Sequence, residues 1–324
     1  MLDFKKEVLA AESRIRQYTR ETPLDYSIAL SRETRSNVFL KCENLQVTGS
    51  FKVRGAINKL LSLSPAQREQ GVVTASSGNH GAAVAFGLNR LKIKGVVFVP
   101  ENVSPTKVEN IRNYTQNLQF YGKDCVQTEL HALNYAKQHD MVYLSPYNDL
   151  KVIGGQGTVG LELMRQLDVI DVVFVPIGGG GLISGIAWYL KSINSNIKII
   201  GCLPENSPVM SESIKAGCVI ERETLPTLSD ATAGGIESGS ITFDLCDQFV
   251  DDYVLVSEEE IKRAIISLIN TQHLLVEGAA GVALGAFLKT AKSKYSKHFY
   301  GANIVVVLSG ANISLETLKL VLVP

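Results

Sequence analysis

The sequence carries no excess charge of either sign. Its 324 residues include 32 lysines and arginines and 32 aspartates and glutamates, so the formal net charge at pH 7 is zero. Proteins that bind nucleic acid or anionic membranes through general electrostatic attraction carry a surplus of basic residues. The balance therefore argues against nucleic acid and membrane surfaces as partners, while it leaves room for a local anion site.

Long hydrophobic runs are absent as well. The longest runs, such as residues 95–100 and 303–310, are far shorter than the roughly 20 apolar residues that span a bilayer. Charges are spread through residues 1–20, a pattern that indicates an amphipathic helix and not a signal peptide. Together these features predict a cytoplasmic protein without a membrane segment.

Cysteine is sparse and forms no recognisable binding pattern. The five cysteines are an odd number and include no CxxC pair. No cysteine–histidine cluster has the spacing of zinc ligands. The sequence therefore predicts free thiols in a reducing compartment, with neither a disulfide framework nor a structural zinc site.

What the chain does contain is a regular alternation of short β-branched runs and longer helical patterns. We expect strands near residues 38–43, 71–76, 94–100, 118–122, 141–145, 171–176, 198–204 and 304–308. Most of these runs are continuously apolar, which indicates that both faces of each sheet are covered. Strand–helix–strand order with covered strands predicts an α/β fold with mainly parallel sheets.

The order strand, glycine-rich turn, small-residue helix occurs twice, at residues 72–86 and 172–189. This repetition predicts two doubly wound lobes that face one cleft. We expect residues 51–143 to form the small lobe. Residues 1–50 and 144–324 would form the large lobe.

Four consecutive glycines follow the expected strand at 171–176 and precede a helix that runs through Trp188. They are Gly178, Gly179, Gly180 and Gly181. Glycines here let successive backbone N–H groups point into one concavity, beside the positive end of a helix. A tight turn without a ligand needs fewer glycines, and no Gly-Lys-Ser/Thr of a Walker loop follows. The pattern predicts a phosphate-binding loop.

A second glycine pattern, Gly155, Gly157 and Gly160, matches GxGxxG. This spacing suggests dinucleotide binding only when it follows a strand, and residues 145–154 do not resemble one. We interpret these glycines instead as letting the chain pass close to the cleft before a helix over residues 158–167.

The string SSGNHG comprises Ser76, Ser77, Gly78, Asn79, His80 and Gly81, and it precedes a helix rich in alanine. Backbone donors and short polar side chains at a helix start suit a small carboxylate. A simple Ser/Asn helix cap is the alternative. For His80, a structural hydrogen bond is favoured over a catalytic role.

Lys52 lies in the string TGSFKVRGA, next to Phe51 and among glycine and serine. A lysine held near a phosphate in such a setting can have a lowered pKa, which an imine-forming amine requires. Ser309 follows the apolar run 304–308, so we expect it at a strand end, pointing into the cleft. The chain thus has one amine, two glycine-rich turns and one serine. This set suits an aldehyde cofactor that is held as a Schiff base, with its phosphate on backbone N–H groups.

The strings TGSFKVRGA, SSGNHG, GGGGLISG and LSGAN, in this order and spacing, resemble the serine/threonine dehydratase group. These are pyridoxal-phosphate enzymes of the tryptophan-synthase-β-like fold (fold type II), and the serine racemases belong among them. The resemblance extends from about residue 22 to residue 312. It implies a cofactor between the two lobes, a small amino-acid substrate and a homodimer.

The resemblance also implies roles for individual residues. Lys52 would be the Schiff-base lysine with Phe51 beside the cofactor, Asn79 would bind the phenolic oxygen, and Ser309 would bind the pyridine nitrogen. The tetraglycine loop would hold the phosphate. Ser76, Ser77, Gly78, Asn79 and His80 would bind the substrate. Ser77 also matches the racemase residue that protonates the opposite face of the substrate. Glu277 would face the substrate amine or only cap its helix.

The implied reaction is β-elimination of water from L-threonine or L-serine, giving a 2-oxo acid and ammonia. Alternatives are racemisation of serine, dehydration of another β-hydroxy amino acid such as hydroxyaspartate or phenylserine, and a non-catalytic protein that binds the cofactor. Three positions depart from the family. Ala311 replaces a common glycine, and Leu203 and Val209 stand where metal-binding members have acidic ligands. We therefore expect no metal site, although Glu205 could be a shifted ligand.

Overall fold

The computed structural model describes residues 4–115, 117–293 and 299–323. It contains two sheets. The strands are β1 (Leu24–Tyr26), β2 (Asn37–Lys41), β3 (Val72–Ala75), β4 (Gly95–Val99), β5 (Leu118–Phe120), β6 (Val142–Tyr143), β7 (Val172–Pro176), β8 (Lys198–Pro204), β9 (Asp252–Val256) and β10 (Asn303–Val307). The larger sheet has the order β1-β2-β10-β7-β8-β9, and the smaller one has the order β5-β4-β3-β6. Every pairing is parallel except β1 with β2, which confirms the predicted α/β class.

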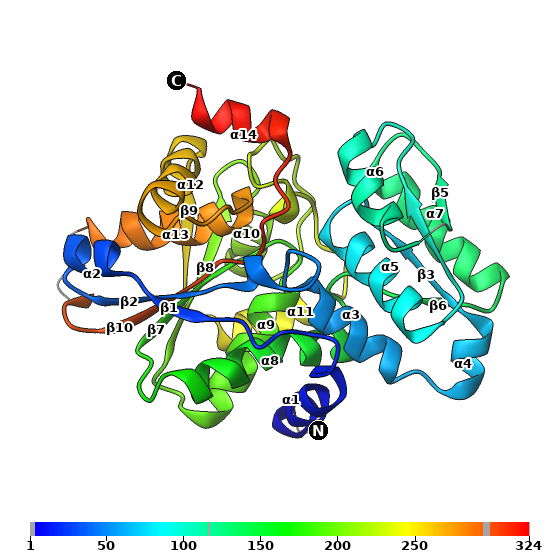
Figure 1. The fold of residues 1–324 in the computed structure, drawn as a ribbon, viewed down its shortest axis with the longest axis horizontal. Coiled ribbons are helices and arrows are strands. Elements are labelled where there is room, and N and C mark those ends of the chain that lie inside the picture. The colour runs from blue at the N-terminus through cyan, green and yellow to red at the C-terminus, as the bar shows by residue number, and fades with distance from the viewer. Residues whose placement is uncertain (1–3, 116, 294–298, 324) are drawn as a thin grey trace.

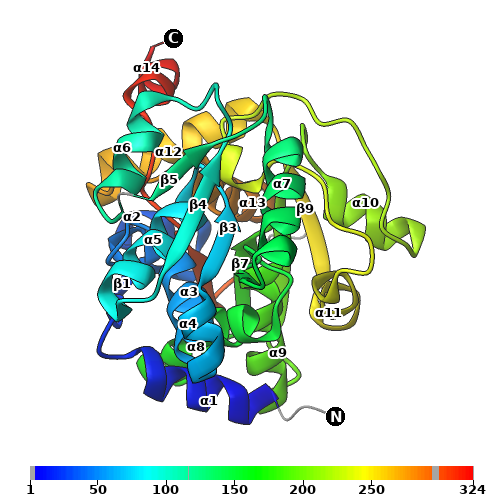
Figure 2. The same ribbon diagram turned by 90° about the vertical axis from the view of Figure 1, so that its right-hand side faces the viewer.

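Helices cover both sheets. They are α1 (Phe4–Ile15), α2 (Ile28–Thr34), α3 (Lys52–Leu61), α4 (Pro65–Gln70), α5 (Asn79–Leu91), α6 (Pro105–Arg112), α7 (Cys125–Gln138), α8 (Leu150–Gln166), α9 (Gly181–Ile193), α10 (Val209–Ala216), α11 (Ile241–Phe249), α12 (Glu258–Gln272), α13 (Gly278–Ala291) and α14 (Leu315–Leu322), with short 3₁₀ turns η1 (Glu43–Leu45) and η2 (Asp230–Thr232). Figure 1 shows the small sheet and its helices on the right, the large sheet on the left, and α3 between them. Seen from the side, α1 and α14 lie at opposite ends of the molecule (Figure 2).

The large sheet is covered on both faces, as its continuous apolar strands predict. Val173 and Val175 of β7 pack with α8 and α9, whereas Val172 and Phe174 pack with α12 and α13. Successive residues of a strand point to opposite faces, so both sets must be apolar to be buried. No helix within the described residues is long and apolar enough to cross a membrane.

The helix predicted at residues 158–167 begins eight residues earlier, at Leu150, so that prediction is wrong at its start. Asp149 caps it, because its carboxylate accepts from the N–H groups of Lys151 and Val152. The GxGxxG glycines therefore lie inside α8. A side chain at Gly155 would stand 2.6 Å from the Gly55 Cα of α3, so the glycines serve the close crossing of α8 with its neighbours. Packing here overrides the low helix propensity of glycine.

Candidate active site

The start of α3 and the end of β10 are joined through their backbones. The Phe51 N–H donates to the Ser309 carbonyl at 3.1 Å, and Ser50 forms an antiparallel bridge with Gly310. Lys52 is the first residue of α3. Two side chains that are 257 positions apart in the sequence, Lys52 and Ser309, are thereby brought to one place.

The Lys52 side chain is partly buried at this junction. Its Nζ donates to the Pro146 carbonyl at 2.9 Å and lies 5.3 Å from the centre of the Phe51 ring. Burial lowers the pKa of Lys52 to about 8, although the Glu277 carboxylate acts in the opposite direction. An amine with this pKa is partly unprotonated near neutral pH, and the unprotonated form is the nucleophile.

The tetraglycine loop leads into α9, with Gly180 as the N-terminal cap in the left-handed region at φ 86°. The first N–H groups of a helix have no partners within it, so they are free for an anion. Tyr147 explains why two further positions are glycine. A side chain at Gly179 would overlap its ring, and one at Gly181 would stand 3.0 Å from its Cα. The loop geometry thus fits a phosphate group and depends on Tyr147.

Tyr147 belongs to the segment that crosses from the small sheet to α8. Its hydroxyl accepts from the Glu237 N–H at 3.0 Å, and the neighbouring Asn148 side chain accepts from the Ile241 N–H at 2.9 Å. With the Pro146 carbonyl on Lys52, this segment touches both the amine and the glycine loop. Sequence reasoning missed it because no motif marks its residues.

The Ser309 hydroxyl is buried, with 1% of the residue exposed, and it has no hydrogen-bond partner among the described residues. An orphaned buried hydroxyl costs free energy unless a ligand engages it. A hydroxyl can donate to a pyridine-type ring nitrogen, so this donor fits such a ring between Lys52 and the strand end.

The SSGNHG string starts α5 at Asn79, with Gly78 as its cap. The Ser76 hydroxyl accepts from the Gly78 N–H at 3.2 Å. His80 Nε2 lies 3.1 Å from the Leu144 carbonyl, and burial together with the Lys52 charge lowers the pKa of His80 to about 3. The ring is therefore neutral near physiological pH, as a structural hydrogen bond requires.

Ser77 is partly exposed and lines a pocket of about 340 Å³ with Lys107 and Asp124 among its walls. Lys107 also forms an ion pair with Asp230 of η2 at 2.8 Å, which connects α6 beside the small sheet to the large lobe. Ser77 thus shares its pocket with the helix that carries the Lys107–Asp230 ion pair.

Glu277 is the cap residue of α13, yet its side chain makes no capping hydrogen bond. Both carboxylate oxygens instead accept from Asn79 Nδ2, at 3.0 and 2.8 Å. Burial raises the pKa of Glu277 to about 7, while the Asn79 hydrogen bond lowers it. Of the two roles considered for Glu277, the structure favours the one that faces the site.

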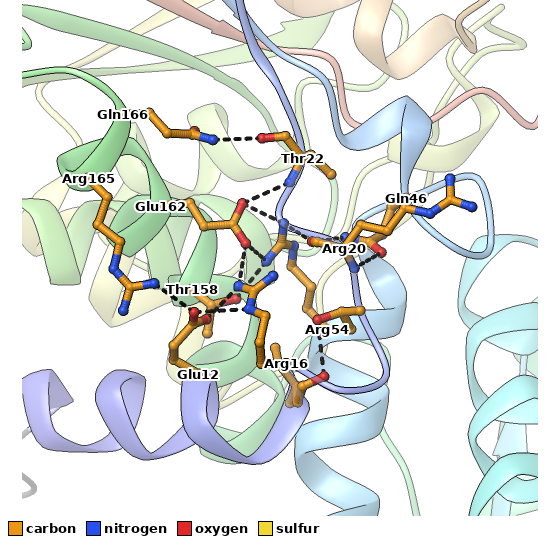
Figure 3. Close-up of polar contacts among 12 residues, drawn as sticks. Glu12, Arg16, Arg20, Thr22, Gln46, Arg54, Thr158, Glu162, Arg165 and Gln166 are labelled. Carbon is orange, nitrogen blue, oxygen red and sulfur yellow. Dashed lines mark hydrogen bonds and ion pairs between the residues drawn. The ribbon is translucent and has the colours of Figure 1, made fainter.

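Sequence reasoning also missed a buried ion cluster around Arg54, which follows Lys52 by two residues on α3; Figure 3 shows Arg54 and Glu162 in it. Arg54 donates two hydrogen bonds to Glu43 and two to Glu162, all at 2.7–2.8 Å. Lys41 Nζ donates to Glu162 at 2.6 Å, and all four of these side chains are fully buried. Lys41 lies opposite Val307 in the sheet, so the cluster braces both α3 and the strand that leads to Ser309.

The resemblance places Leu203 and Val209 where metal-binding members of the family have acidic ligands. Leu203 and Val209 are buried in the core, and Glu205 pairs with Lys289 at 3.2 Å. Across the described ranges, no group of three histidine, cysteine, aspartate or glutamate side chains is arranged to hold a metal ion.

Comparison with known proteins agrees with this geometry. The profile of the family described as pyridoxal-phosphate dependent enzyme matches residues 15–310. The L-threonine ammonia-lyase of Thermotoga maritima is 38% identical over 96% of this chain and 76% of its own length. The catabolic L-threonine dehydratase TdcB of Escherichia coli K12 is 37% identical over 96% of this chain and 93% of its own.

Solved structures of similar fold include serine racemases and threonine deaminases. Maize serine racemase superposes with a TM-score of 0.91 at 32% identity, covering 97% of this chain and 95% of the racemase chain. The processed form of threonine deaminase isoform 2 from Solanum lycopersicum has a TM-score of 0.92 at 33% identity. The superposition covers 98% of this chain and 91% of the deaminase chain.

Proposed function

The chain belongs to the pyridoxal-phosphate-dependent enzymes, and from this premise we propose that it is an L-threonine dehydratase that also accepts L-serine. The single observation that carries the proposal is the partly buried, low-pKa amine of Lys52 at the junction with the strand end that carries Ser309. The names of the relatives supply the substrate class, because two of them are threonine ammonia-lyases or dehydratases over nearly the whole chain.

We assign the cofactor to the groups that surround Lys52. The N–H groups of Gly178, Gly179, Gly180 and Gly181 would hold its phosphate, Ser309 its ring nitrogen, and Asn79 its phenolic oxygen, with Phe51 beside Lys52. When bound, the cofactor withdraws electrons from the substrate α-carbon. The neutral Ser309 hydroxyl would keep the ring a weaker electron sink than a carboxylate would, which favours prompt loss of a β-hydroxyl.

Lys52 has two roles in this proposal. Its amine would hold the cofactor covalently at the aldehyde carbon, with release of one water molecule, and as a free amine it would accept the proton from the substrate α-carbon. The N-terminus of α5, with Ser76, Ser77, Gly78, Asn79 and His80, would hold the substrate carboxylate. Glu277 lies within reach of Asn79 and would face the substrate amine.

The overall reaction removes water across the Cα–Cβ bond of threonine. The enamine product then takes up one water molecule and releases ammonia, which leaves 2-oxobutyrate. We further propose that the enzyme acts in the cytoplasm as a homodimer, which light scattering in solution can test.

The direct experiment supplies pyridoxal phosphate and L-threonine and follows 2-oxobutyrate. Lys52→Ala should lose both turnover and the visible absorbance of the covalently bound cofactor. Lys198→Ala is the matched control, because the Lys198 side chain is 60% exposed and forms its one ion pair among the described residues with Asp251. Borohydride reduction and peptide mapping should place the tag on Lys52. The dehydratase proposal fails if no 2-oxo acid forms from any β-hydroxy amino acid.

Serine racemisation is the second candidate, because the resemblance matches Ser77 to the racemase residue that protonates the opposite face of the substrate, and maize serine racemase shares the fold over nearly all of both chains. Chiral chromatography after incubation with L-serine distinguishes the two activities. Absence of D-serine eliminates the racemase. Covalent cofactor without any turnover would instead favour a non-catalytic binding protein.

A further inference from the structure

A line of side-chain amides runs from the loop before α3 to Glu277. Asn312 Nδ2 donates to the Thr48 carbonyl at 3.0 Å and to Asn79 Oδ1 at 2.6 Å. Asn79 Nδ2 in turn donates to both oxygens of Glu277. The four residues come from four separate parts of the chain, so only the folded protein forms this relay.

The chemistry of its two ends sets the polarity of the relay. A backbone carbonyl can only accept, so the NH₂ group of Asn312 must face Thr48. The same NH₂ group then supplies the donor that Asn79 Oδ1 accepts. Asn79 is left with its N–H groups directed at Glu277, which as a carboxylate also can only accept.

The backbone around Asn312 is built for close approach. Gly49 has a φ of 73°, and a side chain there would stand 2.7 Å from Asn312 Oδ1. A side chain at Gly310 would stand 2.5 Å from Glu277 Oε1. The Ala311 N–H donates to the Gly49 carbonyl at 2.8 Å, and the Glu277 N–H donates to the Gly310 carbonyl at 2.9 Å. These backbone hydrogen bonds fix the segment that carries Asn312 against both the loop before α3 and the start of α13.

We propose that Asn312 is a positioning residue that sets the orientation of the Asn79 amide, so that Asn79 presents donors to Glu277 and to the cofactor's phenolic oxygen. This inference rests on the proposed function, because the cofactor contact of Asn79 is part of it. If the Asn79 amide turned over, its carbonyl oxygen would face the Glu277 carboxylate and could not donate to an anionic oxygen.

The turned amide would also change the charge of Glu277. The groups that face this carboxylate are Asn79 of α5, Lys52 of α3, Asp230 of η2 and the main chain of Asn312. Lys52 and the two asparagines lower the pKa of Glu277, and Asp230 raises it. Loss of the Asn79 donor removes a contribution that keeps Glu277 ionised, so its pKa would rise further.

Two substitutions of Asn312 distinguish the direction of its hydrogen bonds from the space that its side chain fills. Asn312→Asp keeps the shape of the side chain but replaces its donors by acceptors, so it would draw the Asn79 N–H groups toward itself. Asn312→Leu removes hydrogen bonding and leaves Asn79 free to take either orientation. Asn89→Asp is the control, because Asn89 lies on the same helix and donates to the Tyr114 carbonyl at 2.9 Å, at the opposite end of α5.

The experiment measures cofactor affinity by absorbance titration and the pH dependence of the bound cofactor's spectrum. We expect Asn312→Asp to weaken affinity about tenfold or more, the effect of losing a hydrogen bond to a charged group. Asn312→Leu should weaken it less, and Asn89→Asp should match the wild type. The spectral pH midpoint should shift upward in Asn312→Asp.

Three outcomes would overturn the inference. In the first, Asn312→Asp keeps the cofactor affinity and the spectral pH midpoint of the wild type. In the others, Asn312→Leu loses more cofactor affinity than Asn312→Asp, or Asn89→Asp loses as much as Asn312→Asp. Urea unfolding of the cofactor-free variants checks that each folds. A wild type that binds the cofactor without dehydrating threonine would contradict the proposed function alone, since the affinity order would still test Asn312. A wild type that does not bind the cofactor would contradict both.

Discussion

Arg54 and Glu162 form a fully buried ion pair with two parallel hydrogen bonds, which ties the helix that starts at Lys52 to α8. Burial alone would lower the pKa of Arg54, but the carboxylates of Glu43 and Glu162 raise it above its ordinary value. Glu162 also pairs with Lys41 and with the partly exposed Arg16, whereas the only ion pair of Glu43 among the described residues is with Arg54, so removing Arg54 leaves the Glu43 carboxylate unpaired.

Arg54→Met should therefore destabilise the protein strongly. Removing one partner of a buried ion pair costs about 3–5 kcal/mol, and here the Glu43 carboxylate would lose its only ion pair among the described residues in a place that water does not reach. Urea unfolding of the cofactor-free protein measures the effect. Arg263→Met is the control, since the Arg263–Glu259 pair is about two-thirds exposed, and it should change stability by at most about 0.5 kcal/mol. Equal effects of the two substitutions would contradict a structural role for the cluster.

Glu277 should make stability depend on pH. Its pKa is raised from 4.5 to about 7, so between these values the folded protein binds more protons than the unfolded chain. Stability then falls as pH rises through this window, by on the order of 3 kcal/mol in total for Glu277. His80, whose pKa is lowered to about 3, acts in the opposite sense over part of the window, so the wild-type curve alone does not isolate Glu277.

The comparison with Glu277→Gln isolates it, because an amide does not titrate. The free energy of unfolding of Glu277→Gln minus that of wild type should increase as pH rises from about 4.5 to about 7. Urea unfolding of the cofactor-free proteins at several pH values measures this difference. A difference that stays constant with pH would show that Glu277 has an ordinary pKa.

Gly179→Ala should disturb the phosphate loop through Tyr147. The added methyl group would overlap the tyrosine ring, and overpacking of this kind costs about 1–3 kcal/mol. We expect lower cofactor affinity as well as a lower melting temperature. Gly235→Ala has open space around it and should leave both unchanged. If Gly179→Ala behaves like Gly235→Ala, the Tyr147 ring does not fix the loop.

Ser309→Ala should separate stability from function. Because the buried hydroxyl has no protein partner, removing it should leave the cofactor-free protein as stable as wild type or more stable by about 1 kcal/mol. Turnover of the loaded enzyme should fall. Ser211→Ala is the contrast, since its buried hydroxyl donates to the Pro208 carbonyl at 2.9 Å and its removal should cost about 1 kcal/mol. A marked loss of stability in cofactor-free Ser309→Ala would reveal a structural role instead.

Much of the fold could be predicted because its signals are local. The continuously apolar runs around β7 and β10 marked strands that are buried on both faces. The start of α12 is local as well, because the Ser257 hydroxyl and the Glu260 side chain form a capping box three residues apart. The start of α8 was missed because its glycines disfavour a helix locally, and only the packing of Gly155 against Gly55 explains them.

The site was predictable where one residue type carries the chemistry. Lys52, Ser309 and the four glycines stand in motifs, and the fold brings Lys52 and Ser309 to one junction. Pro146, Tyr147 and Arg54 have no such signal. Pro146 acts through its backbone carbonyl, and the Tyr147 ring fills the space that the glycines leave. Arg54 acts through its ion pairs with carboxylates on η1 and α8.

By itself, the sequence determined the α/β class, the family and the amine at position 52, because periodicity, glycine clusters and a lysine motif are properties of neighbouring residues. Only the tertiary structure decided that Glu277 turns to Asn79 and not to its own helix, and that Asn312 donates to the Asn79 side-chain oxygen. The physical reason is that hydrogen-bond direction, burial and pKa depend on atoms that are hundreds of residues apart along the chain and meet only after folding.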